Sequence, residues 1–242
     1  MPSFIWNRDP QEAMDNPYEY DAQGQFIREA AMVLSQVSII LGKYNMTYKV
    51  QDKSIEKALW MLYNDSLDSL IDVHESLKSK KHRIAGKLLR DIIESMDLAA
   101  YFSTESKESN QNLVKWFNDE IIPHRIYRDF LGKTAGEDAK ERSKDYYRII
   151  SKFTHRTYKI LLYGYVLGRE DFISYDGHGE NDLLILPQTI AMYLAILADF
   201  IQTFIFELIK SGFISKEEMK IIWETSFEAL PVQRRFAIRG YN

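Results

Sequence analysis

Two side chains suited to phosphate chemistry, Arg148 and His155, lie seven residues apart in the stretch YYRIISKFTHRTYKILLYGYVLG. An imidazole transfers protons near neutral pH, and a guanidinium stabilises negative charge that develops on a reacting phosphoryl group. If the stretch is a helix, seven residues correspond to a rise of about 10 Å, which a long arginine side chain can bridge. The two residues then reach one shared ligand.

A helical projection gathers polar residues of this stretch into one stripe. At about 100° per residue, the members of the stripe fall within about 60° of Arg148. They are Arg148, Ser151, Lys152, His155 and Lys159. The opposite side of the projection carries the large apolar residues Ile149, Ile150, Phe153, Ile160 and Leu161. We therefore expect the stripe to face away from the core, with Arg148 and His155 as catalytic residues and Ser151, Lys152 and Lys159 as binding residues.

Two functions agree with this stripe. In the first, it is the site of a metal-independent endoribonuclease, in which the 2′-hydroxyl attacks phosphorus, His155 moves protons and Arg148 stabilises the phosphorane. In the second, the stripe is an ordinary solvated face of a non-catalytic helical interaction or structural protein. The spacing alone does not decide between them, because arginine and histidine often occur at such a separation by chance.

The sequence contains few other residues or motifs that could catalyse a reaction or bind a metal. The chain has no cysteine, which excludes disulfides, thiol catalysis and cysteine-ligated metals and suits a reducing cytoplasm. The Glu-x-x-His pattern of di-iron bundles does not occur. We expect His74, at the edge of an apolar face, to be structural, and the loop with His178, Glu180 and Asp182 to be a solvated turn. No metal and no cofactor is predicted.

The net charge and the hydropathy of the chain indicate whether it can bind nucleic acid or cross a membrane. The formal net charge of −4 gives no global attraction to polyanions, so nucleic acid needs a local basic patch. The segments around His124, Arg125 and Arg128, and around Arg234, Arg235 and Arg239, offer further basic groups. The apolar stretch 183–209 contains Asp199 and Glu207, so we expect a buried helix rather than a membrane span. With no signal-peptide pattern at the N-terminus, a cytoplasmic location is expected.

Helical periodicity runs through almost the whole chain, and glycine and proline are sparse. We expect helices at about 23–43, 53–80, 83–103, 110–121, 137–167, 187–211 and 215–229. Gly42, Gly168 and Gly212 are placed to end helices, and the sequence SKEE at Ser215 predicts a capping box. No strand pair is expected. The predicted fold is therefore all-α, one domain over 1–242 built as an antiparallel helical bundle with additional helices at both ends.

The HEPN superfamily of all-α bundle proteins has a related pattern. In its members an arginine and a histidine, separated by four to six residues, lie late in the helical core. Through Arg148 and His155 in RIISKFTH, the chain resembles these prokaryotic toxins, abortive-infection proteins and RNA-processing nucleases. The residue after the arginine, usually polar in the family, is Ile149. The resemblance implies a four-helix core at about 53–167, a C-terminal extension at about 183–242, RNA as substrate, a homodimer with the stripe at its two-fold axis, and an antitoxin-like protein partner.

Overall fold

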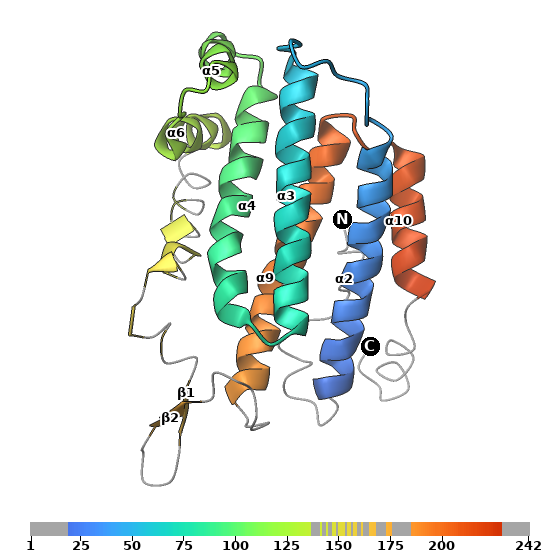
Figure 1. Ribbon diagram of the computed structural model, residues 1–242, viewed down its shortest axis with the longest axis vertical. Helices are drawn as coiled ribbons and strands as arrows, with labels where there is room; N and C mark the ends of the chain where they lie inside the picture. The colour runs from blue at the N-terminus through green and yellow to red at the C-terminus, as the bar shows by residue number, and fades with distance from the viewer. Residues whose placement is uncertain are drawn as a thin grey trace.

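The computed structural model describes residues 19–136, a series of single residues between 141 and 161, residues 165–167, 173–175 and 185–228. In this part of the chain the fold is a helical bundle with one small two-stranded hairpin (Figure 1). The elements are α2 (Glu19–Gly42), α3 (Ile55–Lys78), α4 (His82–Phe102), α5 (Lys107–Phe117), α6 (His124–Ala135), β1 (Tyr165–Leu167), β2 (Ile173–Tyr175), α9 (Ile185–Lys210) and α10 (Lys216–Glu228).

The long helices α2, α3, α4 and α9 share one apolar core. In Figure 1, α3 stands between α4 and α2, with α9 behind them and α10 on the far side of α2. Each of the four helices contributes side chains that are completely removed from solvent, such as Val37, Leu70, Leu89 and Leu197. Because each helix is apolar on one side, the elements bury these sides only by packing together.

Local signals set the helix ends much as the sequence predicts. The capping box at the start of α10 is confirmed: the Glu218 amide donates to Ser215 Oγ at 3.1 Å, and the Ser215 amide donates to Glu218 Oε2 at 2.8 Å. Gly42 ends α2, and Gly212, just after α9, has a φ of 78°, which a residue without Cβ adopts at no steric cost. Gly168 lies outside the described residues.

Two expectations about the elements are wrong. Tyr165–Leu167, expected at the end of a helix, is strand β1, and it pairs antiparallel with β2. Short runs rich in tyrosine, valine and isoleucine suit a strand as well as a helix, and three residues show no period that separates the two. Helix α6, for which no helix was expected, begins directly after Pro123 and packs against α4.

The division of the chain also differs from the expected one. Helix α9 contacts α2, α3 and α4, and its buried residues belong to the same apolar core as theirs. The segment 185–210 is therefore one of the main helices of the bundle rather than an extension to a core at 53–167. Among the described residues, no helix has the length and apolarity needed to cross a membrane.

A buried histidine joins the start of α4 to α9. The side chain of His82 is only 6% exposed, and its ring centroid lies 5.8 Å from that of Tyr193 on α9. Burial lowers the pKa of His82, and the charge of Arg83 lowers it further. Because the unfolded chain then takes up this proton first, the contribution of His82 to stability is present above about pH 6.5 and is lost as the pH falls below it.

We predict that His82→Phe weakens the acid sensitivity of the fold. Phenylalanine preserves a ring against Tyr193 but has no proton to gain, so the unfolding free energy of the variant falls less than that of the wild type between about pH 7 and pH 5. One proton limits this difference to about 1.4 kcal/mol per pH unit. Urea unfolding at several pH values measures it, with the exposed His155→Ala as control. Equal pH dependence in wild type and His82→Phe would contradict the assignment.

Candidate functional site

The segment that carries the predicted stripe turns one side to the bundle and the other to solvent. Ile150 is completely buried and Tyr147 is half-buried. On the other side, Arg148, Lys152 and His155 are exposed and Ser151 is partly buried. Arg148, Lys152 and His155 therefore have the orientation that the projection predicts, whereas the hydroxyl of Ser151 is buried. Lys159 lies outside the described residues.

The helix is interrupted just after His155. The His155 amide still donates to the carbonyl of Ser151 at 3.2 Å, as in a helix. The Thr157 amide instead donates to the carbonyl of His155 at 2.8 Å. Because helical geometry does not continue through this point, the projection fails beyond it: Leu161, expected in the core, is 37% exposed.

Tyr147 lies at the centre of a polar cluster that it forms with side chains of α4 and α6. We call this group the Tyr147 cluster. Its members are Tyr147, Arg90, Glu94, His124 and Arg128. The Tyr147 hydroxyl donates to Glu94 Oε1 at 2.8 Å, and Arg90 Nε donates to the same oxygen at 2.7 Å. The guanidinium carbons of Arg90 and Arg128 lie 5.5 Å and 5.8 Å from the centroid of the Tyr147 ring. Two cations, a carboxylate and a phenol thus meet around the Tyr147 side chain.

His124, the first residue of α6, completes this cluster. Its ring centroid lies 4.4 Å from that of Tyr147 and 4.9 Å from that of Tyr127. Its Nε2 lies 2.9 Å from Asp97 Oδ2 on α4, and the side chain is 10% exposed. A histidine that is held by a carboxylate on one ring nitrogen is oriented in the way that acid–base catalysis requires.

The cluster also shifts the acidity of its members. Burial raises the pKa of Glu94, but the hydrogen bonds from Arg90 and Tyr147 outweigh burial and hold it below the usual value. Burial, followed by the hydrogen bond to Glu94, raises the pKa of Tyr147. Glu94 is therefore ionised and Tyr147 protonated at neutral pH, so the phenol is the donor in their hydrogen bond.

Sequence reasoning finds only part of this cluster. His124, Arg125 and Arg128 stand out as basic groups, but the roles of Glu94, Asp97 and Tyr147 do not. One local signal was available: Arg90 and Glu94 are four residues apart, and Asp97 follows Glu94 by three, so all three share a face of α4. Sequence spacing does not show that α6 and Tyr147 pack against that face of α4.

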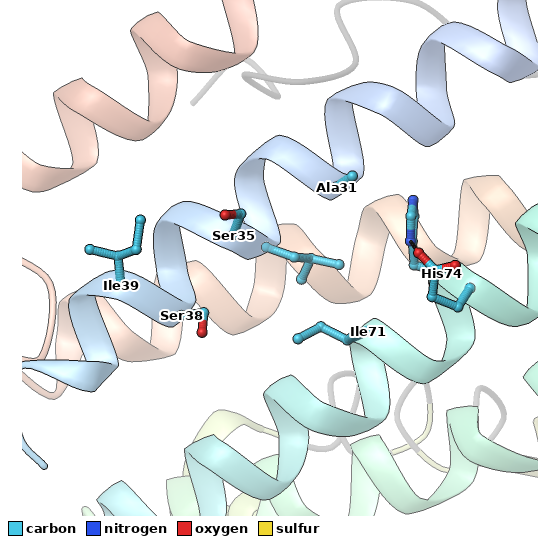
Figure 2. Close-up of a pocket in the computed structure, with 8 residues that line it drawn as sticks. Ala31, Ser35, Ser38, Ile39, Ile71 and His74 are labelled. Atoms are coloured by element: carbon cyan, nitrogen blue, oxygen red, sulfur yellow. Dashed lines mark ion pairs between the residues drawn. The ribbon is translucent and has the colours of Figure 1, made fainter.

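A second group of polar side chains lies in a groove of about 280 Å³ between α2 and α3 (Figure 2). It is lined by Ala31, Leu34, Ser35, Ser38, Ile39, Ile71, His74 and Glu75. His74 is 3% exposed, its Nε2 lies 2.8 Å from the carbonyl oxygen of Ile27, and its Nδ1 lies 3.2 Å from Glu75 Oε1. Nε2 thus joins α3 to α2, while Nδ1 contacts a neighbour on α3 itself, and the structural role expected for His74 is confirmed.

Within the described ranges, no three His, Asp or Glu side chains come together in a way that holds a metal ion. The loop residues His178, Glu180 and Asp182 lie outside those ranges. No family model matches the chain, and no curated protein or solved structure matches it either. Its function is therefore argued from the stripe and the Tyr147 cluster alone.

We predict that Tyr147→Phe lowers the unfolding free energy by about 1 kcal/mol, since it removes one hydrogen bond to a charged acceptor while leaving the ring in place. Part exposure of Glu94 keeps the loss at the low end of the range for such bonds. Urea unfolding measures it. In a double-mutant cycle with Glu94→Ala, which removes the acceptor, the two changes should not be additive, because both remove the same bond. Additive losses would contradict the predicted coupling.

Proposed function

We propose that the protein is an HEPN-like cytoplasmic homodimer that acts on RNA as a metal-independent endoribonuclease, with Arg148 and His155 as its catalytic residues. The observation that carries the proposal is the exposed position of Arg148, Lys152 and His155 on one segment. An antitoxin-like protein is the partner that the family resemblance implies. The competing function is that of a non-catalytic interaction protein.

The stripe suits an RNA backbone. An acidic chain attracts a polyanion only where its cations are locally exposed, and Arg148 and Lys152 are exposed about one helical turn apart. Phosphates along a single strand are close enough together for both side chains to bind the same strand. The hydroxyl of Ser151, between them, is buried, so the proposed phosphate contacts are those of the two cations.

The proposed reaction assigns each step to a side chain or to the RNA itself. His155 takes the proton of the 2′-hydroxyl as the bond between O2′ and phosphorus forms. The bond from phosphorus to O5′ then breaks, and the imidazolium returns a proton to that oxygen. Arg148 stabilises the charge that builds up on the phosphorane, an effect worth on the order of 3 kcal/mol for one well-placed donor.

We predict that His155→Ala and Arg148→Ala both abolish cleavage of single-stranded RNA. Both side chains are exposed, so each variant should keep its unfolding free energy within about 0.5 kcal/mol of the wild type. Gel assays with end-labelled RNA measure cleavage, and Lys210→Ala, at the far end of α9, is a matched control for loss of an exposed cation. A chelator should not change the rate, since no proposed step uses a metal. Absence of cleavage by the wild type, or full activity of both variants, would refute the catalytic proposal.

We also predict a dimer whose interface includes the stripe. Multi-angle light scattering at tens of micromolar, a range in which even weak association is detected, should give twice the 28.4 kDa chain mass. Lys152→Glu changes the charge at the interface and should shift the population toward monomer, whereas Lys210→Glu should not. A monomeric wild type would count against the homodimer.

A further inference from the structure

The groove between α2 and α3 has room for a large apolar side chain. Three of the side chains that α2 turns to the groove are small: Ala31, Ser35 and Ser38. Ile71 and His74 of α3 border the same space (Figure 2). An apolar cavity of roughly 150 Å³ already holds benzene. The groove, at about 280 Å³, can therefore take one aromatic ring.

Exposed apolar side chains extend this surface across α2. Met32 and Ile39 are 36% and 59% exposed, and they lie two turns apart on one side of the helix. Lys43, eleven residues after Met32, lies on that side as well, and it forms an ion pair with Glu218 of α10. Since Ile39 also lines the groove, an apolar path leads from the α10 side of α2 into the groove.

Helix α10 ends level with the groove. The ion pair of Lys43 with Glu218 fixes the start of α10 beside the end of α2, and the two helices run antiparallel (Figure 1). From Glu218 to Glu228, the last residue of α10, the helix rises about 15 Å. The same rise back along α2 from Lys43 reaches Val33, which lies between the groove residues in sequence.

The sequence that follows α10 is basic and carries large apolar residues. Residues 229–242, which we call the arginine segment, lie outside the described residues, but their sequence contains no acidic residue. It contains three arginines around two apolar residues: Arg234, Arg235, Phe236, Ile238 and Arg239. Eight residues of extended chain span about 26 Å, whereas a helix is about 10 Å across. Phe236, eight residues after Glu228, can therefore cross α2 and reach the groove.

The α3 side of the groove has the opposite charge. Glu75 lines the groove, and Asp68 and Asp72, at helical spacing before it, share its side of α3 and are exposed. Glu75 is paired with Lys78, whereas no described residue forms an ion pair with Asp68 or Asp72. Arginine is well suited to such carboxylates, because its planar guanidinium can donate two parallel hydrogen bonds.

We propose that the groove between α2 and α3 is the docking site of the arginine segment of the same chain. Phe236 enters the groove, and the arginines beside it lie along Asp68 and Asp72. Apolar shape, charge and the reach of the chain all favour this one occupant. The contact does not depend on the proposed RNA cleavage, and it turns these arginines toward carboxylates rather than toward a nucleic acid.

Disulfide trapping in the full chain tests this contact, because the chain has no cysteine of its own. Ser38→Cys places a thiol at the groove and Ala237→Cys places one next to Phe236, and a disulfide requires their Cα atoms to come within about 7 Å. Mild oxidation should join them within one chain, as measured by non-reducing gels and peptide mass spectrometry. Ala237→Cys paired with Thr203→Cys, an exposed site on α9, should react about tenfold more slowly, since no contact raises the local concentration there.

Charge reversal tests the chemistry of the contact. Asp68→Lys with Asp72→Lys should slow trapping at the groove by about tenfold, and Arg234→Glu with Arg235→Glu should do the same. All four changes together should restore trapping, because the pairs are then inverted. Equal trapping rates at the groove and at the α9 control site would overturn the proposal, as would a rate that no reversal changes. A disulfide formed only between two chains would overturn docking within one chain.

Discussion

The hydrogen bond that Tyr147 donates to Glu94 fixes the segment bearing Arg148 and His155 on the bundle. It joins residues 53 positions apart at 2.8 Å. Arg90 holds the same carboxylate oxygen, and His124 lies against the tyrosine ring, so the hydroxyl and the ring are both fixed. Ile150, buried three residues later, determines the rotation of the segment. With Tyr147 and Ile150 facing inward, the stripe can only face outward.

The main helices are predictable from sequence because they are long and amphipathic. In α3, the acidic side chains are all exposed, as an amphipathic helix requires: Asp65, Asp68, Asp72 and Glu75. The exact ends follow from local chemistry such as the Ser215 capping box. The failures have different causes. β1 has three residues, too few for a hydrophobic period to distinguish helix from strand. Helix α6 begins without a side-chain capping hydrogen bond, so no capping motif marks its start in the sequence.

The candidate site likewise has one part that the sequence predicts and one part that it does not. That Arg148, Lys152 and His155 face solvent follows from a helical projection, since the orientation of neighbouring residues is a local property. The Tyr147 cluster is a tertiary property. It combines α4, α6 and the stripe segment, and its contacts depend on how α6 packs against α4 after Pro123. No spacing within one element carries that information, which is why Asp97 and His124 are not recognisable as a pair from sequence.

The Tyr147 cluster and the stripe differ in how their charged side chains are arranged. In the Tyr147 cluster each cation has an acidic neighbour: Arg90 pairs with Glu94, and Arg128 with Asp129 at 3.3 Å. Such pairing leaves little net positive charge to attract a polyanion, but it fixes side chains in place at low local dielectric. Under the proposed function, RNA phosphates contact the exposed side chains of Arg148 and Lys152 and release bound counterions. The Tyr147 cluster then holds the segment that carries these side chains against the bundle.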